Sequence, residues 1–211
     1  MTEYHKIQTV FKRSQDNNFR TLLMDEYSKP EFEYLADNQW IFTEKVDGTN
    51  IRIMYQDGAL SFGGKTDKAE IPPYLMEALE NLNLGEKVKD VFEGKYVCLY
   101  GEGYGPKIQK VGKLYREDHS FVLFDIKIGS FWLNRDDVLE IGEKLDLDVV
   151  PVIGAGTLET MVNKCIDGFN STWGDFKAEG IVARPEIELK ARNGERIITK
   201  LKLKDFEGVD V

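Results

Sequence analysis

Apolar residues along the chain gather in short stretches that are rich in aromatic and β-branched side chains and are separated by turn-forming residues. This composition is typical of β-strands and predicts strands at residues 40–45, 50–55, 59–62, 96–100 and 121–126. The tripeptide Gln56-Asp57-Gly58 predicts the turn between the second and third of these strands. We expect a loop after the fourth strand, where three glycines and a proline follow: Gly101, Gly103, Gly105 and Pro106.

One helix is predicted from the spacing of its apolar residues. It begins at Pro72-Pro73 and ends near Gly85, and its apolar positions are Leu75, Met76, Leu79 and Leu82. The dipeptide Asn193-Gly194 is a strong hairpin signal. The alternating segment at residues 197–204 is therefore expected to be the second strand of a C-terminal hairpin.

Two further helices are predicted from their N-cap residues. Asn134 is expected to begin a helix that runs to about Leu145, and Thr157 one that runs to about Ile166. Because most strands follow one another through hairpins, with helices inserted between them, the pattern favours an α+β fold with antiparallel sheets over a doubly wound parallel fold. The sequence has no internal repeat or low-complexity linker, so residues 1–211 are expected to form one domain.

The composition is that of an ordinary globular protein. The chain has 211 residues, 42% of them apolar, and no window approaches the roughly 18 to 20 apolar residues of a membrane span. The polar start of the chain lacks the apolar segment of a secretion signal. Cys98 and Cys165 lack the spacing of a metal site and are expected to be buried free thiols. We therefore expect a soluble, unexported protein.

The charge distribution is uneven. A net charge of -9 argues against a protein that coats nucleic acid by bulk attraction. One basic segment has four cations and no acid: Lys107, Lys110, Lys113 and Arg116. A second has seven cations against three glutamates: Arg184, Lys190, Arg192, Arg196, Lys200, Lys202 and Lys204. A single charge run is usually only a solvated surface, but two in an acidic chain favour a localised phosphate partner.

The residues with the most specific chemistry are Glu-Lys-Val-Asp-Gly-Thr-Asn at 44–50. A lysine two residues before Asp-Gly can carry a nucleotide covalently, and Lys45 lies at a predicted strand end, where the turn begins. The motif is short, and by itself it equally fits a solvated lysine beside a hairpin turn.

Four further segments follow in a particular order, and with them the chain resembles the covalent nucleotidyltransferases, which include polynucleotide ligases and messenger RNA capping enzymes. It is most similar to the bacteriophage-type RNA ligase 2 family, which seals double-stranded RNA. The matching segments are Glu-Lys-x-x-Gly-Thr-Asn at 44–50, Tyr-Gly-Glu-x-x-Gly-Pro-x-Ile-Gln-Lys at 100–110, Phe-x-x-Phe-Asp-Ile at 121–126, Ala-Glu-Gly-x-Val at 178–182 and Lys-x-Lys at 200–202. The resemblance implies a nucleotidyltransferase (ATP-grasp-like ligase) fold, in which two antiparallel sheets flanked by helices enclose an AMP cleft.

The resemblance assigns the catalytic lysines. Lys45 would attack the α-phosphorus of ATP, release pyrophosphate and hold AMP covalently. This step requires a neutral amine, which nearby cations and a bound metal ion favour. Lys200 and Lys202 alternate with leucines, so a strand would place both amines on one face, and in the family two lysines at this place contact the α-phosphate.

The resemblance also assigns the nucleotide-binding residues. Glu102 corresponds to the ribose-binding carboxylate, and Glu179 to a carboxylate near the metal ion, for which Glu102 is a second candidate ligand. Phe124 corresponds to the aromatic residue that stacks on adenine, although Phe121 and Phe124 are expected on opposite faces of their strand, one of them in the core. Glu44 would read the adenine amino group. The remaining contacts to the nucleotide or the RNA end would come from Val46, Thr49 and Asn50.

Basic residues would contact phosphates. Lys65 stands where the family has an arginine, and a lysine offers a point charge in place of a bidentate fork. Arg184 corresponds to a basic residue that could bind pyrophosphate or nucleic acid. Lys107, Lys110 and Lys204 would contact the nucleic acid strand.

The function implied is an ATP-dependent RNA ligase of RNA repair that uses Mg²⁺, or Mn²⁺ in its place, to seal nicked duplex RNA or RNA/DNA hybrids. The sequence leaves no room for the extra domain of family ligases or for an OB-fold, so a partner is expected to supply end recognition. We expect a monomer, without membrane contact, in the cytoplasm of a bacterial or phage-infected cell.

Three alternatives remain open from the sequence. A DNA ligase is favoured by Asp47 and disfavoured by Asn50. A nucleic-acid-end-binding module without catalysis is suggested by Lys65 and by the missing domain. A capping guanylyltransferase is disfavoured by Glu44, which suits adenine.

Overall fold

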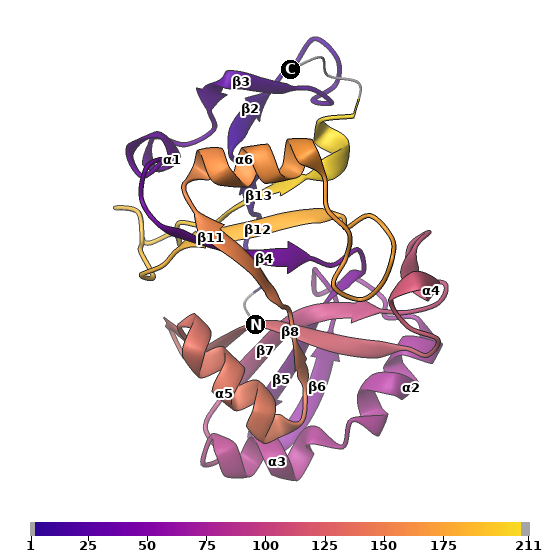
Figure 1. Ribbon diagram of the computed structural model, residues 1–211. Helices are drawn as coiled ribbons and strands as arrows, with labels where there is room; N and C mark the ends of the chain where they lie inside the picture. The colour runs from indigo at the N-terminus through magenta and orange to yellow at the C-terminus, as the bar shows by residue number, and fades with distance from the viewer. Residues whose placement is uncertain (1–2, 208–211) are drawn as a thin grey trace. The chain divides into compact units, whose positions relative to one another are not determined.

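The computed structural model describes residues 3–207, which divide into two compact units (Figure 1). The central unit comprises residues 3–5 and 46–150, and the flanking unit comprises residues 6–45 and 151–207. Each unit has its own sheet and its own hydrophobic core. The peptide bond between Lys45 and Val46 is one of the points where the chain passes from one unit to the other.

The sheet of the central unit has the strand order β10-β8-β7-β5-β6, and β9 pairs with β8. Its strands are β5 (Thr49–Gln56), β6 (Ala59–Gly63), β7 (Val97–Tyr104), β8 (Ser120–Ile128), β9 (Phe131–Trp132) and β10 (Asp148–Val149). All pairings are antiparallel except that of β10 with β8. The long β5, β7 and β8 correspond to strands predicted from composition.

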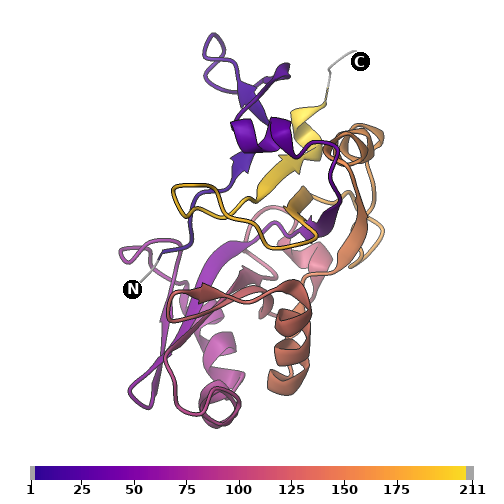
Figure 2. The same cartoon turned by 90° about the vertical axis from the view of Figure 1, so that its left-hand side faces the viewer.

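Three helices of the central unit share a core with its sheet, and Figures 1 and 2 show them on the same side of that sheet. They are α2 (Pro73–Asn81), α3 (Leu84–Val91) and α5 (Arg135–Leu145), and a fourth short helix is α4 (Gly112–Tyr115). Leu79, Val88 and Val138 from these helices are buried in one cluster with Ile53 and Leu99 from the sheet. The helices thereby take up one face of the sheet, and the other face carries a separate cluster of aromatic and sulfur-containing residues.

The sheet of the flanking unit has the strand order β1-β13-β12-β4-β11. Its strands are β1 (Gln8–Thr9), β4 (Trp40–Lys45), β11 (Val152–Gly156), β12 (Gly180–Pro185) and β13 (Thr199–Lys202), antiparallel except for β1 with β13. A separate hairpin pairs β2 (Phe11–Arg13) with β3 (Leu22–Tyr27), and the helices are α1 (Pro30–Tyr34), α6 (Leu158–Asp167) and the 3₁₀ turn η1 (Leu203–Asp205). Residues of α6 are buried together with Trp40, Ile181 and Leu201 of the sheet.

The predicted α+β class with antiparallel sheets is confirmed, and so are both N-caps. The side chain of Asn134 accepts a hydrogen bond from the backbone N–H of Asp137 at 2.9 Å, and that of Thr157 accepts from Thr160 at 3.2 Å. These bonds satisfy backbone donors that the first helical turn leaves without partners. They fix where α5 and α6 begin.

The predicted loop after residue 100 was wrong, because β7 continues through Gly101 and Gly103 to Tyr104. A Cβ atom on Gly101 would lie 2.3 Å from the ring of Phe121, and one on Gly103 would lie 2.6 Å from the side chain of Leu75. The glycines are therefore there because core side chains lie directly against the strand, not because the chain turns.

Two predicted ends were also misplaced. Gly85 does not end a helix: Asn83, with a left-handed φ of 50°, separates α2 from α3, and Gly85 is the second residue of α3. The predicted strand at 197–204 stops at Lys202, after which the chain forms η1. The Asn193-Gly194 turn does form, with Ala191 N–H donating to Glu195 O at 2.8 Å, but β13 pairs mainly with β12.

Cys98 and Cys165 are free and buried, as predicted. Burial raises the pKa of the Cys98 thiol to about 11 and that of Cys165 to about 12, because a thiolate is poorly solvated there. Among residues 3–207, no helix is long and apolar enough to cross a membrane.

Candidate active site

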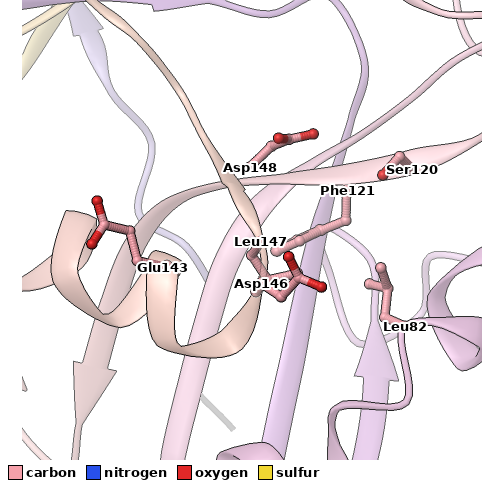
Figure 3. A pocket seen from close by; sticks show the side chains of 8 residues that line it. Leu82, Ser120, Phe121, Glu143, Asp146, Leu147 and Asp148 are labelled. Carbon is pink, nitrogen blue, oxygen red and sulfur yellow. The ribbon is translucent and has the colours of Figure 1, made fainter.

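A surface pocket of about 310 Å³ lies in the central unit, and none of the predicted site residues lines it (Figure 3). Three carboxylates stand on its wall, those of Glu143, Asp146 and Asp148. Such a lining repels phosphate. The nucleotide chemistry expected from the sequence must therefore lie elsewhere.

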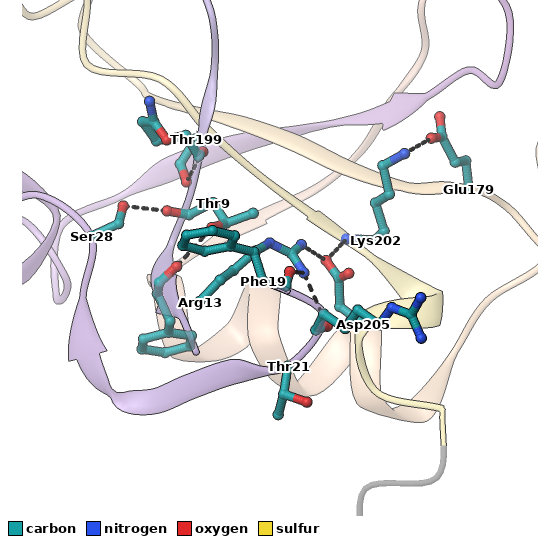
Figure 4. Close-up of polar contacts among 12 residues, drawn as sticks. Thr9, Arg13, Phe19, Thr21, Ser28, Glu179, Thr199, Lys202 and Asp205 are labelled. Atoms are coloured by element: carbon teal, nitrogen blue, oxygen red, sulfur yellow. Dashed lines mark hydrogen bonds and ion pairs between the residues drawn. The ribbon is translucent and has the colours of Figure 1, made fainter. Parts of the chain in front are cut away.

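Lys45, Glu179 and Lys202 form one ion-pair cluster within the flanking unit. The Nζ atom of Lys45 lies 2.6 Å from Glu179 Oε2, and the Nζ atom of Lys202 lies 2.6 Å from Glu179 Oε1. Figure 4 shows the second of these contacts. One carboxylate thus bridges two lysines that are 157 residues apart in the sequence.

The strand register explains why these three residues meet. Gly180 lies opposite Lys45 on β4 and opposite Lys202 on β13, so the glycine is the residue between the two lysines. A Cβ atom at Gly180 would lie 2.1 Å from the backbone oxygen of Leu201, so only glycine fits at this point of β12. Glu179 comes directly before it and can reach both amines.

Lys200 and Lys202 share one face of β13, as their alternation with leucines predicts. Leu201 between them is fully buried in the core of the flanking unit, while both lysines are half-buried. Lys200 lies opposite Val182 on β12. The face that carries Lys45 therefore carries both lysines of the Lys-x-Lys motif.

The cluster has an excess of positive charge. Two ammonium groups and one carboxylate give a net charge of +1 at positions that are about a fifth to a quarter exposed for the lysines. Partial burial weakens solvent screening, so this cluster attracts an anion more strongly than the same three groups would on a fully exposed surface. It is suited to a phosphate.

Residues that the motifs did not reveal hold Lys202 in place. The carboxylate of Asp205 accepts from the backbone N–H of Lys202 at 3.2 Å and pairs with Arg13 Nη2 at 2.8 Å (Figure 4). Asp205 thereby caps η1 directly after the Lys-x-Lys motif. The signal that could have found it is an acidic residue three positions after Lys202, the spacing of a helix cap.

The side chain of Glu44 points away from the face that carries Lys45. Strand alternation puts Glu44 on the core face of β4 with Trp40 and Phe42, and Lys45 on the opposite face. Its carboxylate accepts hydrogen bonds from Thr172 rather than lying beside the Lys45 amine. Reading of the adenine amino group by this side chain stays a prediction.

In the central unit, Asn50, Glu102 and Phe124 share one face of the sheet. Asn50 lies opposite Glu102 in the pairing of β5 with β7. The register of β7 with β8 shifts at Tyr100, and Phe124 is the extra residue of this bulge. Alternation from Phe121 places Phe124 on the side of Tyr100, against which it packs, and the bulge puts Asp125 on that side as well. Phe121 is 1% exposed in the core on the other face, as predicted.

Tyr4 lies against Phe124 on this face. The two ring centroids are 5.0 Å apart in an edge-to-face arrangement, and the Tyr4 hydroxyl donates to the buried carboxylate of Asp125. Tyr100 and Trp132 complete the aromatic group, with centroids 5.2 and 5.6 Å from that of Tyr4. The sequence motifs gave no signal for Tyr4, which belongs to a strand-free segment far from them in the chain.

The turn after Lys45 packs closely on Glu102. A Cβ atom at Gly48 would lie 2.6 Å from Glu102 Cγ and 2.3 Å from the backbone oxygen of Gly103. Gln109 donates to the Gly48 carbonyl at 3.1 Å, and the Tyr115 hydroxyl accepts from the Asp47 N–H at 3.1 Å. The segment around Gln109 thus supports the turn that follows the candidate nucleophile.

Of the smaller residues around this turn, Val46 is 4% exposed, and Thr49 lies opposite Gly103. Lys65 is exposed in the loop after β6, where the buried guanidinium of Arg52 donates to the Gly64 carbonyl at 2.8 Å. Arg52 therefore supports the loop that carries Lys65.

The basic segments are less uniform than the sequence suggested. Lys107 and Lys110 are exposed in the central unit, and Lys204 is exposed in η1 and off the strand. Arg184 is only 5% exposed in β12, and Arg196 is buried beside Glu188 at 2.5 Å. The second segment is thus not one exposed basic strip, since burial removes two of its cations from the surface.

Three or more metal-ligating side chains do not gather anywhere in residues 3–207. A magnesium ion needs fewer, because it keeps several waters and is bound through one or two carboxylates together with substrate phosphates. Glu179, with a phosphate on the neighbouring lysines, fits this mode of binding. Glu102 is the other candidate carboxylate, and it belongs to the central unit.

Comparison with known proteins identifies the family of this chain. A family model described as RNA ligase matches residues 38–202. A structure of a Naegleria gruberi RNA ligase variant with AMP and Mn has a TM-score of 0.67 at 18% identity, and the match covers 96% of this chain and 58% of that one. The same ligase with PPi gives the same four values. A variant with ATP and Mn gives a TM-score of 0.69 at 18% identity, over 96% and 56% of the two chains.

At such low identity these likenesses establish the fold, and the chain spans less than three fifths of the length of the ligases matched. No curated protein sequence matches it.

Proposed function

Because the chain belongs to the RNA ligase family, we propose that it is an ATP-dependent RNA ligase, which joins a 5′-phosphate to a 3′-hydroxyl through AMP bound covalently to Lys45. The observation that carries the proposal is the carboxylate of Glu179, 2.6 Å from both the Lys45 and the Lys202 amines. Sequence motifs far apart in the chain thereby converge on one charged group.

The first step forms the enzyme-AMP adduct. The amine of Lys45 attacks the α-phosphorus of ATP, an N–P bond forms, and the bond to the bridging oxygen breaks so that pyrophosphate leaves with its electron pair. An ammonium that donates to a carboxylate has no free electron pair, so the Lys45–Glu179 contact and one proton must be given up first. Lys202 and Lys200 face the same side and would offset the charge on the α-phosphate.

Two transfers complete the reaction. In the first, an oxygen of the 5′-phosphate attacks the α-phosphorus, and the N–P bond to Lys45 breaks. In the second, the 3′-hydroxyl attacks the 5′-phosphorus, a phosphodiester bond forms, and AMP leaves with the oxygen it had gained. The lysine is returned unchanged, so the cycle consumes one ATP per join.

Glu179 is the residue that would hold Mg²⁺ or Mn²⁺, and Glu102 is the second candidate. A bound divalent ion supplies charge neutralisation on the phosphates. Its binding to Glu179 would compete with the two lysines for the same oxygens, and so would favour release of Lys45.

The adenosine part of the nucleotide is assigned to the central unit. The Glu102 carboxylate can accept from ribose hydroxyls, and the bulge at Phe124 presents an aromatic ring on the same face for stacking. The ligands named for the Naegleria gruberi ligase support an adenylylation step, since ATP is the substrate of that step and pyrophosphate is its released product.

The nucleic acid substrate is proposed to be nicked duplex RNA or an RNA/DNA hybrid. Lys107 and Lys110 are exposed and carry the positive charge that backbone contacts require.

The test is incubation with ATP labelled at the α-phosphate, followed by denaturing electrophoresis and a chase with nicked substrates. We expect an acid-labile adduct with ATP, none with GTP or NAD⁺, and none in Lys45→Ala. The chase should release label as AMP only when the 5′-phosphate lies in a nick. An adduct that persists in Lys45→Ala would overturn the assignment of the nucleophile, and joining of DNA alone would overturn that of the substrate.

A further inference from the structure

Glu44 is a buried carboxylate on the core face of β4, next in sequence to Lys45. Its exposed fraction is 1%, and Trp40 and Phe42 on the same face belong to the apolar core of the flanking unit. A carboxylate in such a place is costly unless hydrogen bonds replace its lost water. The residues that donate hydrogen bonds to this carboxylate therefore indicate the role of the Glu44 side chain.

Thr172 supplies both of the hydrogen bonds. Its backbone N–H donates to Glu44 Oε2 at 2.9 Å, and its hydroxyl donates to the same oxygen at 2.8 Å. The second oxygen, Oε1, is buried without a partner among the residues the structure describes. Thr172 is therefore the source of the polar contacts that hold this carboxylate.

Thr172 lies in the loop between α6 and β12, residues 168–179, and the loop is closed by its own hydrogen bonds. The Ser171 N–H donates to the Phe176 carbonyl at 2.7 Å, and the Ala178 N–H donates to the Phe169 carbonyl at 3.1 Å. The loop thus presents the two donors of Thr172 from a defined conformation. The loop's own hydrogen bonds connect the part that holds Thr172 to the end of the loop at Ala178.

The end of this loop is Glu179, the residue that contacts Lys45. The segment 168–179 is therefore joined to β4 twice, through Glu44 and Thr172 on the core face and through Lys45 and Glu179 on the other. In the first contact the Glu44 carboxylate is buried and Thr172 is exposed, and in the second contact Lys45 and Glu179 are both partly exposed. Only the second has to break during the proposed reaction, so the first is available to hold the loop in place.

We propose that Glu44 and Thr172 are positioning residues that fix Glu179 against Lys45, and that the Glu44 side chain does not read the base. The inference rests on the proposed function, since it takes Lys45 as the nucleophile. Displacement of a catalytic group by about 1 Å can cost on the order of 100-fold in rate. A contact that fixes Glu179 therefore supports the rate of adduct formation.

Four substitutions test the proposal in the full chain. Glu44→Met removes the acceptor and keeps the volume, and Thr172→Val removes the hydroxyl donor. Glu44→Gln keeps an acceptor oxygen for Thr172, and Thr172→Ser keeps both donors. Thr160→Val is the matched control, because its hydroxyl is 3.1 Å from Thr157 in the same unit and touches neither residue.

The readouts are the maximal rate of adduct formation, the ATP and Mn²⁺ concentrations that give half of it, and the ratio of ATP to GTP use. We expect Glu44→Met to lower the maximal rate by about 10- to 100-fold and Thr172→Val by about 10-fold. The Mn²⁺ requirement should rise in both, while half-saturation by ATP stays within about threefold. Thr172→Ser, Glu44→Gln and Thr160→Val should remain near the wild type.

Each result separates one explanation from another. If Glu44→Gln removes the preference for ATP over GTP, the side chain reads the base and the proposal is overturned. Normal rates in Glu44→Met and Thr172→Val would overturn it as well. If Glu44→Met does not fold, the rates of Thr172→Val and Thr172→Ser are compared instead. Both of these variants keep the buried carboxylate of Glu44. Absence of an adduct in the wild type would instead reject the proposed function.

Discussion

Arg13 pairs with Asp205 across 192 positions of the sequence, with Nη2 and Oδ2 2.8 Å apart. The Asp205 side chain is 5% exposed, and that of Arg13 is 24% exposed. The same carboxylate accepts from the Lys202 backbone N–H. The contact therefore connects β2 to the chain directly after the Lys-x-Lys motif, and it fixes the last residue of β13.

Replacing Asp205 by alanine should destabilise the chain and disturb Lys202. The substitution removes a helix cap and leaves Arg13 without its carboxylate in a mostly buried place, so we expect a loss of about 1 to 3 kcal/mol in the free energy of unfolding. Urea unfolding of the full chain measures it. Glu26→Ala is the matched control, because its pair with Lys12 is about half exposed and should contribute less than about 0.5 kcal/mol. Equal effects of the two substitutions would contradict this account.

Lys202 and Lys204 should differ sharply although they are two residues apart. Lys202 contacts Glu179 beside the nucleophile, whereas η1 carries Lys204 away from β13 into solvent. Lys202→Ala should slow adduct formation by about 100-fold or more, because a cation beside the reacting phosphate is lost. Lys204→Ala should leave this step, which needs no nucleic acid, within about threefold.

The measurement is the rate of AMP labelling at saturating ATP and Mn²⁺. A similar loss in both variants would show that general positive charge, rather than the position of Lys202, supports the reaction. A loss confined to Lys204→Ala would contradict the role given to Lys202.

Local structure could be predicted well from the sequence. Trp40–Lys45 forms β4 with the predicted bounds, and Asn134 and Thr157 begin their helices, because strand composition and N-caps act within a few residues. The shared face of Lys200 and Lys202 follows from alternation in the same way. These predictions needed no knowledge of what lies far away in the chain.

The features that the sequence did not reveal depend on distant neighbours. Gly101 and Gly103 look like loop residues until Phe121 and Leu75 are found against them. The position of Glu44 follows from the register of β4 with β12, and the role of Asp205 follows from its contact with Arg13. Tertiary packing decides each of these, and local propensity carries no information about it.

Gly180 should tolerate no side chain. A Cβ atom there would lie 2.1 Å from the Leu201 backbone oxygen and 2.7 Å from Lys202 Cα, and a sheet cannot widen at one residue without losing its hydrogen bonds. Gly180→Ala should therefore cost about 1 to 3 kcal/mol or more of stability and slow AMP labelling, because the strands that carry Lys45 and Lys202 are displaced.

Gly85→Ala is the control, with the opposite expected sign. Gly85 lies in α3, and a Cβ atom added there would have no neighbouring atom within 4 Å, so alanine should stabilise the chain by about 0.5 to 1 kcal/mol through helix propensity. Thermal and urea unfolding of the two variants give the comparison. Stabilisation by Gly180→Ala would refute the close packing of β12 on β13.

The two thiols should make the fold sensitive to alkaline pH. Burial raises the pKa of Cys98 from 9.0 to about 11 and that of Cys165 from 9.0 to about 12, so above pH 9 the unfolded chain releases protons that the folded chain retains. The stability associated with each neutral thiol is therefore complete below pH 9 and is lost as the pH rises toward 11 for Cys98 and 12 for Cys165. We expect the free energy of unfolding to fall from about pH 9 to about pH 11. The fall should be smaller in Cys98→Ala, when the free energy of each protein is compared with its own value at about pH 8.

The same burial should keep both thiols from reacting with a disulfide reagent at about pH 8 until urea unfolds the chain. Rapid modification of the folded protein, or a pH profile that Cys98→Ala leaves unchanged, would contradict the burial of that thiol.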